Sequence, residues 1–447
     1  MSTLKFDLIV IGAGPGGIEA ALYAAKRNIK TAIISATKIG GRATWGSLIP
    51  SKVWLASAEN AQSIINASTF GFQNKETPVL NMDVLRSRIK TQSSKAAQLY
   101  ENRLVEANVD VFYGMAKVTG DKTVIIEKEG KETVVASAKH LIISSGSAPI
   151  FFPNIKPNKD HIIAPKIAPG IEKIPDSILI AGGGVTGTEF AFAFAALGSQ
   201  VTIVQAQNQL LPRLDAAICQ RYETHLREAF NINIIVDTKV SAMKQIGQKV
   251  VTTLDSGEVI ESEYGFISIG RKADLSFLEN PSDLLLTPDN MVQIDEYCRT
   301  SQKGIYAIGD LTGAPMTANK ATMQARIAVS HILLGAENTL LPAHNIEAVY
   351  SEPPVASIGN MNEEEHAEFI SKSLNQLVKP NIWNEAAGFL KIKIDTRSGL
   401  FKGAAGYGKN MPEIMAIIQT AMNNDIAYRD IYKIPFAHPT FSEILSF

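Results

Sequence analysis

The chain is poor in cysteine. Its 447 residues contain two, Cys219 and Cys298, which lie in different segments and form no CxxC spacing. Isolated cysteines in a chain of ordinary composition are most often unpaired thiols, because disulfides persist mainly in secreted proteins. We therefore expect two free thiols, and we assign no residue to metal binding.

The chain also lacks an excess of charge of either sign and any long apolar run. Its 43 basic and 44 acidic residues give a formal net charge of −1, which does not indicate a nucleic-acid-binding face. No apolar run reaches the ~20 residues of a membrane span. Residues 1–7 carry an acid where a secretory signal needs an apolar stretch. We therefore expect a cytoplasmic protein that neither binds nucleic acid nor spans a membrane.

Two segments repeat one pattern of buried strand, glycine loop and alanine-rich helix. In the first, an apolar run over residues 5–11 is followed by glycines, by a helix over 18–27 and by a strand over 31–34. In the second, a strand over 177–181 leads to a glycine loop, a helix and a strand over 201–204. Each set predicts a strand–helix–strand unit, the building block of a parallel sheet.

Both loops follow the GxGxxG pattern of dinucleotide-binding proteins. The first glycine allows a tight turn, the second lets backbone amides approach a pyrophosphate, and the third lets helix and strand pack closely. The positive end of the helix dipole adds a favourable field for phosphates. One such loop could merely close a turn, but two in the same context indicate two dinucleotide sites. The glycines are Gly12, Gly14 and Gly17 in the first loop, and Gly182, Gly184 and Gly187 in the second.

Both units depart from the usual pattern at the end of the following strand. An acidic residue normally accepts hydrogen bonds from the adenosine ribose there, but this chain has Ser35 and Gln205. A neutral acceptor forfeits roughly 1 kcal/mol, or about five- to tenfold in affinity. Residues 205–209 contain neither an acid to repel the 2′-phosphate of NADP nor an arginine to bind it. The sequence therefore favours NAD and leaves NADP open.

The rest of the chain completes an α/β protein. A third strand over residues 305–310 ends in Gly-Asp and precedes another helix. Toward the C-terminus the chain changes to shorter strands, at 347–350 and 389–394, with one helix at 412–423. We expect two tandem Rossmann-like dinucleotide-binding domains and a C-terminal α+β domain.

The glycine loops belong to a longer set of ordered motifs. With them, the chain resembles the dihydrolipoamide dehydrogenase and glutathione reductase family of pyridine nucleotide–disulfide oxidoreductases over nearly its whole length. The motifs that carry the resemblance are GAGPGG (12–17), IPSK (49–52), SGS (145–147), the second glycine loop with Glu189, IGR (269–271), AIGD (307–310) and HPTFSE (438–443).

The resemblance implies a homodimer that binds FAD and NAD(P). It places an FAD-binding domain, with a central segment, at residues 1–148 and 271–342, an NAD(P)-binding domain at 149–270 and a dimerisation domain at 343–447. It implies that Asp310 bonds the ribityl chain or pyrophosphate region of FAD. The cofactor-binding residues expected on these grounds, in addition to the six loop glycines, are Ser35, Lys52, Gly114, Ser145, Gly146, Gln205, Gly270, Arg271, Gly309 and Asp310.

The resemblance breaks at the redox centre. The family carries two cysteines in GGxCxxxxCIPSK, and residues 40–52 have Ala43 and Leu48 in those positions. Neither side chain can form a thiolate or a mixed disulfide. We therefore expect that the family's route of disulfide reduction is closed. The bulky Trp45, Leu48 and Trp54 either fill the space of the missing disulfide or stack on a planar acceptor.

The residues implied to move hydride and protons are kept. By resemblance, Lys52 lies beside N5 of the flavin and pairs with Glu189. A buried ion pair is costly to keep without a role, so we expect hydride transfer onto the flavin to remain. By the same resemblance, His438 and Glu443 match the family's base and its orienting carboxylate, supplied by the partner subunit. The alternative is that these two residues only hold the dimer interface together.

The sequence leaves two classes of function open. The first is an NAD(P)H-dependent FAD oxidoreductase that passes electrons to a small molecule other than a disulfide, such as a quinone, a metal ion, oxygen or a second nicotinamide nucleotide. The second is a catalytically relaxed dimer that binds FAD and NADH as a sensor or scaffold. Lys52, Glu189 and His438 favour the enzyme, whereas the neutral Ser35 and Gln205 favour relaxation.

Overall fold

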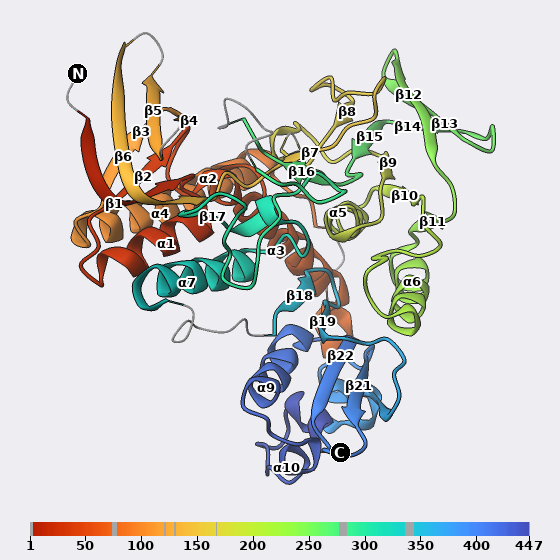
Figure 1. Ribbon diagram of the computed structural model, residues 1–447. Helices are drawn as coiled ribbons and strands as arrows, with labels where there is room; N and C mark the ends of the chain where they lie inside the picture. The colour runs from red at the N-terminus through yellow and green to blue at the C-terminus, as the bar shows by residue number, and fades with distance from the viewer. Residues whose placement is uncertain are drawn as a thin grey trace. The chain divides into compact units, whose positions relative to one another are not determined.

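The computed structural model describes residues 3–73, 78–119, 122–128, 131–166, 168–276, 284–335 and 344–446. The chain forms two compact units, each assembled from segments that are far apart in the sequence (Figure 1). The first unit consists of Met1–Pro50, Arg88–Ile150 and Arg271–Ala343, and the second of Ser51–Ser87, Phe151–Gly270 and His344–Phe447.

The first unit is built on a seven-stranded sheet. Neighbours in the order β3-β2-β1-β6 are parallel, and β17 runs parallel to the end of β6. Strands β5 and β4 continue the sheet antiparallel from the start of β6. The strands are β1 (Leu4–Ile11), β2 (Thr31–Ser35), β3 (Asp110–Tyr113), β4 (Met115–Thr119), β5 (Thr123–Lys128), β6 (Lys131–Ile143) and β17 (Ile305–Ala307).

Burial on both faces explains why β1 ends in a continuous apolar run, Leu8–Ile11. Leu8 and Val10 belong to one core cluster, and Ile9 and Ile11 to the other. Side chains alternate between the faces of a strand, so a parallel strand covered on both sides needs apolar residues at every position. Two helices, α3 (Leu48–Ile65) and α4 (Met82–Glu106), are divided between the two units. The further elements of the first unit are α1 (Pro15–Ala25), α2 (Gly41–Trp45), α7 (Ala318–Leu334), η4 (Gly309–Thr312), β7 (Ser147–Pro149) and β16 (Arg271–Ala273).

Within the described residues, the second unit contains three sheets. A five-stranded sheet has the order β11-β10-β9-β15-β8, with all of its neighbours parallel. A three-stranded antiparallel sheet follows the order β12-β13-β14. Their strands are β8 (Ile162–Ile163), β9 (Ser177–Ala181), β10 (Gln200–Val204), β11 (Asn233–Ile235), β12 (Val240–Ile246), β13 (Lys249–Leu254), β14 (Val259–Ser262) and β15 (Tyr264–Ile267).

The C-terminal part of the second unit is a five-stranded antiparallel sheet in the order β18-β19-β22-β21-β20. Helix α9 packs its buried face, including Ile414 and Ile418, into the same core cluster as Ile392 of the sheet. The strands are β18 (Ile346–Val349), β19 (Val355–Gly359), β20 (Ala367–Ser373), β21 (Phe389–Asp395) and β22 (Phe401–Tyr407). The helices of the second unit beyond α3 and α4 are α5 (Val185–Ala196), α6 (Ala216–Phe230), α8 (Val378–Ile382), α9 (Met411–Asn423) and α10 (Tyr428–Tyr432).

The predicted elements are confirmed, with shifts at their ends. Helix α1 begins at Pro15, three residues before the predicted start, because proline is preorganised for the first helical turn. The strand predicted over 305–310 is wrong at its end: β17 stops at Ala307, and Gly309 has a positive φ of +78° that a strand cannot continue through. No helix among the described residues is both long and apolar enough to cross a membrane.

The expected α/β architecture with a C-terminal α+β region is present. The division into three domains stays a prediction: its boundary after residue 148 falls inside β7, and that after residue 342 lies outside the described residues. The compact units differ from that division in two respects: Ser51–Ser87 groups with the second unit, and the predicted NAD(P)-binding and dimerisation domains fall into one unit.

Candidate active site

The first glycine loop joins β1 to α1, and its three glycines meet three different needs. Gly12 has φ +105°, and a Cβ there would lie 2.2 Å from the carbonyl oxygen of Ser144. A Cβ on Gly17 would lie 1.9 Å from the carbonyl oxygen of Gly12. A Cβ on Gly14 would meet nothing within 4 Å. The loop is therefore closed on the protein side and open at Gly14, where a pyrophosphate needs access.

The N-terminus of α1 offers unpaired donors at the same place. Gly14 is the N-cap residue, and within the described structure no side chain caps this end of the helix. The first amide groups of a helix have no intrahelical partner and carry the positive end of its dipole. This arrangement fits a phosphate group, so the first loop fits the FAD expected there.

Ser35 and Gly114, two further predicted cofactor residues, lie together at the end of β2. The carbonyl oxygen of Ser35 accepts a 2.9 Å hydrogen bond from the amide of Gly114. A Cβ on Gly114 would be 2.6 Å from the carbonyl oxygen of Glu127, so only glycine fits. Ser35 is 3% exposed, which leaves it little surface for a ribose. Their role in cofactor binding stays a prediction.

Four motif segments of the first unit meet around Asp310. The hydroxyl of Ser147 donates a 2.5 Å hydrogen bond to Oδ2 of Asp310, and Nε of Arg271 donates a 2.8 Å bond to the Ser147 hydroxyl. Nε of Arg271 lies 3.8 Å from the same carboxylate oxygen. Arg42 donates a 2.9 Å bond to the carbonyl oxygen of Ser147. The structure thus gathers residues that the sequence separates by more than 250 positions.

Sequence reasoning missed Ser147 and Arg42 in this network. Ser147 belongs to the SGS motif, whereas Arg42 had no signal beyond its place directly before the altered position 43. Burial lowers the pKa of the Arg42 guanidinium, with Asp310 and Asp274 opposing the shift. Ser145 donates a 2.7 Å hydrogen bond to the carbonyl oxygen of Asp274, so a second residue of the SGS motif is also bonded near this network.

Three further predicted glycines act through backbone geometry. Gly309 has φ +78° and donates its amide to the side-chain oxygen of Gln324 at 2.8 Å. Gly146 and Gly270 also have positive φ, at +78° and +128°. A residue with a side chain would be strained at each of these turns.

The second glycine loop joins β9 to α5 and repeats the geometry of the first. A Cβ on Gly182 would lie 2.5 Å from the carbonyl oxygen of Ser268, and one on Gly187 would lie 1.9 Å from that of Gly182. A Cβ on Gly184 would meet nothing within 4 Å. The repetition of one closed and one open side in both loops supports two dinucleotide sites.

Gln205 supports the second loop directly. Its side-chain oxygen accepts a 3.0 Å hydrogen bond from the amide of Gly183, and its side-chain nitrogen donates to Gln207 at 3.2 Å. The side chain is therefore engaged by the protein, and its predicted contact with a ribose stays untested.

Lys52 and Glu189 form an ion pair inside the second unit. Nζ of Lys52 lies 2.7 Å from Oε1 of Glu189, and the side chains are 32% and 6% exposed. The amide of Tyr350 donates a 3.0 Å hydrogen bond to the same Oε1. Nζ of Lys52 also lies 4.4 Å from the centroid of the Tyr350 ring, which is cation–π distance. Tyr350 therefore holds both members of the pair.

Tyr350 was not among the predicted residues. It follows β18, and no glycine loop or charged motif marks it. Burial raises the pKa of its phenol, and the carboxylates of Glu189 and Glu413 add to the shift. The phenol therefore stays protonated across the neutral range.

The side chains of Trp54 and Trp45 both make contacts within the protein. Trp54 is fully buried and packs against Phe194 and Phe190, with ring centroids 5.3 and 6.2 Å away. Trp45 donates its indole N–H to the carbonyl oxygen of Ile39 at 2.8 Å. Of the two roles left open by the sequence, space filling therefore fits Trp54, whose faces are covered.

Both cysteines are buried free thiols, as expected. Burial raises the pKa of Cys219 and that of Cys298 to about 12. Both thiols therefore stay protonated at neutral pH and cannot act as thiolate nucleophiles. No group of histidine, cysteine and carboxylate side chains within the described residues could hold a metal ion.

His438 and Glu443 are paired, as the resemblance implied. Nδ1 of His438 lies 2.8 Å from Oε1 of Glu443, and the amide of Thr440 donates a 2.7 Å hydrogen bond to Oε2. The bond from Thr440, followed by that from His438, lowers the pKa of Glu443. The carboxylate therefore stays charged and orients the imidazole, whose side chain is 64% exposed.

Comparison with known proteins identifies the class. The model of the pyridine nucleotide-disulphide oxidoreductase family matches residues 6–325, and that of the family's dimerisation domain matches residues 346–446. The chain belongs to this family of FAD- and NAD(P)-binding oxidoreductases, which confirms the expected fold class and cofactors. The dimerisation domain supports a homodimer.

Among curated proteins the chain is similar to dihydrolipoyl dehydrogenases. It is 30% identical to that of Chlorobaculum parvum, with 99% of this chain and 96% of the relative covered. It is 27% identical to that of Bacillus subtilis, with 99% and 96% covered.

Two solved structures share the fold. LpdA from Mycobacterium tuberculosis superposes with a TM-score of 0.89 at 24% identity, covering 98% of each chain. The Cu(II) complex of the HOCl-induced flavoprotein disulfide reductase RclA from Escherichia coli has a TM-score of 0.87 at 21% identity, covering 100% of this chain and 98% of that one.

Proposed function

We propose that the protein is an FAD-dependent NAD(P)H oxidoreductase whose electron acceptor is not a disulfide. When bound, FAD supplies the two-electron chemistry between nicotinamide and acceptor. The observation that carries the proposal is the ion pair of Lys52 and Glu189, in a chain that has Ala43 and Leu48 where the family has cysteines.

The donor side of the proposal follows from the cost of that pair. The Glu189 side chain is 6% exposed, and without the ammonium its buried charge would keep only the hydrogen bond from the Tyr350 amide, at a cost of roughly several kcal/mol. Apolar replacements of such pairs are often neutral or stabilising, so binding alone gives no reason to keep one. We assign Lys52 to stabilise negative charge that develops on the flavin during reduction, and Glu189 to hold the ammonium in place.

The acceptor side follows from the thiols. Ala43 and Leu48 cannot relay electrons through a disulfide, and Cys219 and Cys298, with pKa values of about 12, are protonated at neutral pH. An acceptor that takes electrons without an enzyme thiolate is therefore required. A quinone-like molecule, a metal ion, oxygen or a second nicotinamide nucleotide meets that requirement.

Several expectations from the sequence are part of the same proposal. They include the three domains as first delimited, a cytoplasmic homodimer, and His438 with Glu443 as the proton-carrying pair at the partner's site. The proposed cofactor-binding residues are Gly12, Gly14, Gly17, Ser35, Lys52, Gly114, Ser145, Gly146, Gly182, Gly184, Gly187, Gln205, Gly270, Arg271, Gly309 and Asp310. FAD would be bound non-covalently, so the purified protein should be yellow.

The alternative is a catalytically relaxed dimer that binds FAD and NADH as a sensor or scaffold. It is favoured by Ser35 and Gln205, which replace the acids that normally bind the two riboses. The burial of Ser35 and the bond from Gly183 to Gln205 give both residues structural roles that do not depend on turnover.

Anaerobic titration of the purified protein with NADH and with NADPH separates the two functions. The proposed enzyme should lose its flavin absorbance within seconds to minutes with at least one nicotinamide, and regain it when a quinone or oxygen is added. A flavin that neither nucleotide reduces within minutes would leave only the binding function.

A further inference from the structure

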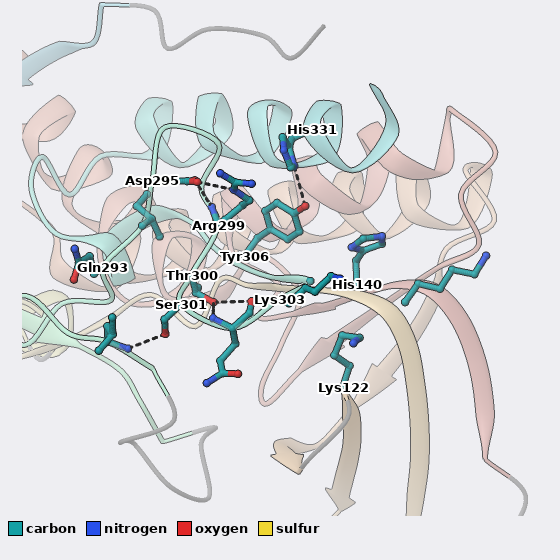
Figure 2. Close-up of a pocket in the computed structure, with 15 residues that line it drawn as sticks. Lys122, His140, Gln293, Asp295, Arg299, Thr300, Ser301, Lys303, Tyr306 and His331 are labelled. Carbon is teal, nitrogen blue, oxygen red and sulfur yellow. Dashed lines mark hydrogen bonds and ion pairs between the residues drawn. The ribbon is translucent and has the colours of Figure 1, made fainter. Parts of the chain in front are cut away.

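A groove in the first unit lies apart from the glycine loop and is rich in cationic side chains (Figure 2). Its volume is about 710 Å³, within the range of small-molecule sites. It is formed by the end of β6, the residue before β5, the segment that precedes β17, β17 itself and the last turn of α7. The residues that matter for its charge are Lys122, Lys139, Asp295, Arg299 and Lys303.

The basic groove, as we name this site, has an excess of positive charge. Four cationic side chains line it against the single carboxylate of Asp295. Arg299 is paired with Asp295 at 2.5 Å, and Lys139 with Asp7 at 2.7 Å. No ion pair with another described residue is recorded for Lys122 or Lys303. Within the described part of the chain, these two ammonium groups therefore have no paired carboxylate.

The turn before β17 holds the Lys122 stem against the groove wall. Gly304 has φ +79°, and a Cβ there would lie 3.3 Å from both Cδ of Lys122 and the carbonyl oxygen of Lys139. The same turn also carries the hydroxyl of Ser301. Ser301 accepts a 3.1 Å hydrogen bond from the amide of Leu285, which leaves its hydroxyl proton able to donate to a ligand.

Aromatic and imidazole rings form the other wall. The hydroxyl of Tyr306 lies 2.9 Å from Nδ1 of His331, and the His140 ring lies 6.1 Å from the Tyr306 ring. Burial lowers the pKa of both histidines. Both imidazoles are therefore uncharged at neutral pH, and the positive charge of the groove comes from its lysines and Arg299.

The basic groove is separate from the FAD loop. Ala321, near the start of α7, contacts Gly16 of the glycine loop, whereas His331 in the last turn of α7 lines the groove. At a rise of 1.5 Å per residue these two positions on α7 are about 15 Å apart. A ligand could thus occupy the groove while FAD is bound.

We propose that the basic groove binds a phosphorylated small molecule whose phosphate groups contact Lys122, Lys303 and the hydroxyl of Ser301. A phosphate group suits this arrangement because it carries up to two negative charges and several acceptor oxygens, which ammonium and hydroxyl donors can share. Arg299, paired with Asp295, also lines the groove. Contacts with lysines that are half-buried, as Lys122 is, or exposed, as Lys303 is, are individually weak, so binding should depend strongly on salt.

Isothermal titration calorimetry of the FAD-loaded protein tests this site. Tripolyphosphate, ATP and adenosine are injected separately, with NAD present at saturation to occupy the second glycine loop. The test variant is the double substitution Lys122→Gln/Lys303→Gln. The matched control is Lys90→Gln/Lys95→Gln, which removes the same charge from exposed positions of α4 in the same unit.

We expect tripolyphosphate to bind the wild type and the control equally, and the test variant at least tenfold more weakly, with flavin content unchanged. Tighter binding of ATP than of tripolyphosphate would identify a nucleotide ligand, and equal binding a polyphosphate, both in support of the groove. Two results would overturn the proposal: no binding of either phosphate compound at low salt, or equal affinity in the test variant and the wild type. Ser301→Ala gives a second check and should weaken binding about threefold.

Discussion

At the residue scale, the charged pair of Lys52 and Glu189 is the feature on which the proposed activity depends. Lys52→Met removes the ammonium and Glu189→Gln removes its counter-charge, while the glycine loops keep their geometry. Each should slow flavin reduction by NADH in stopped-flow measurements by tenfold or more, about 1.4 kcal/mol of barrier for each factor of ten. Both variants should still purify with FAD. Reduction at the wild-type rate in either variant would remove the pair from the mechanism.

Tyr350 should act on the same step through its ring. Tyr350→Phe keeps the cation–π contact with Lys52 and the backbone bond to Glu189, so reduction should stay within about twofold of the wild type. Tyr350→Leu keeps only the backbone bond, and the loss of a contact worth about 0.5–1.4 kcal/mol should slow reduction about two- to tenfold. The ratio of the two rates is the measurement, because a purely structural role of the phenol would make both variants alike.

Residues differ in how far the sequence could predict them. The loop glycines and the pairs Lys52–Glu189 and His438–Glu443 were predictable because each sits in a motif that the resemblance carries. Tyr350 was not, because its contact with Glu189 runs through a backbone amide, which any residue type possesses. Arg42 likewise reaches Ser147 through a main-chain oxygen, and such a contact leaves no trace in residue identity.

At the scale of elements, the first glycine loop allows binding and folding to be separated. Gly14→Ala adds a methyl group on the open side, where nothing in the protein lies within 4 Å, so the apoprotein should keep its thermal stability. It should bind FAD at least tenfold more weakly, because the methyl group occupies the approach of the pyrophosphate. Gly17→Ala places a methyl group 1.9 Å from the carbonyl oxygen of Gly12 and should lower the melting temperature of the apoprotein as well. Equal FAD affinity of Gly14→Ala and the wild type would contradict the assigned loop.

A cluster of three carboxylates around Lys409 makes the second unit sensitive to pH. Nζ of Lys409 lies 2.7 Å from Glu59, 3.1 Å from Glu352 and 3.8 Å from Glu385. Burial raises the pKa of Glu352 to about 7. The ammonium of Lys409 opposes this shift, and the carboxylates of Glu385 and Glu59 offset part of its effect. The folded state therefore holds this proton more tightly than the unfolded chain does. That contribution to stability is complete below the ordinary glutamate pKa and is lost as the pH rises through about 7.

Glu352→Gln should remove that loss. Between pH 5 and pH 8 the wild type should lose more thermal stability than the variant, by an amount on the order of 1–3 kcal/mol. Differential scanning fluorimetry across this range measures the difference. Glu363→Gln, at an exposed position outside the cluster, is the control and should follow the wild type. Parallel curves for Glu352→Gln and the wild type would show that Glu352 is charged throughout.

Elements were easier to predict than their ends. Apolar runs that continue over both faces identified β1 and β9, and the helices after them followed from the loops. The predicted end of the third strand was wrong because Gly309 turns the chain with a positive φ. Glycine adopts positive and negative φ about equally readily, so its presence in a sequence does not show which sign φ has. The basic groove could not be predicted either, since its lysines come from three segments that only the sheet brings together.

At the scale of the whole molecule, the question is whether a chain that resembles dihydrolipoyl dehydrogenases over its full length performs their reaction. The chain is 30% identical to one of these relatives over 99% of its own length, and by the resemblance it has Ala43 and Leu48 where the family has its redox cysteines. Overall similarity reports the fold and the cofactors, because many residues share those tasks. A thiol relay would rest on two sulfur atoms, and the two cysteines that the chain does have, Cys219 and Cys298, are buried and protonated.

We therefore predict no oxidation of dihydrolipoamide by NAD above the uncatalysed rate, whatever the flavin content of the preparation. The Bacillus subtilis relative, assayed at equal flavin concentration, serves as the positive control. The same preparation should reduce a quinone with NADH, because that route needs only the nicotinamide, the flavin and the pair of Lys52 and Glu189. Quinone turnover without dihydrolipoamide turnover is the pattern that separates this protein from its relatives. Dihydrolipoamide oxidation at a rate near that of the control would mean that a substrate thiolate reaches the flavin without an enzyme thiol. That result would contradict the proposal that the acceptor is not a disulfide.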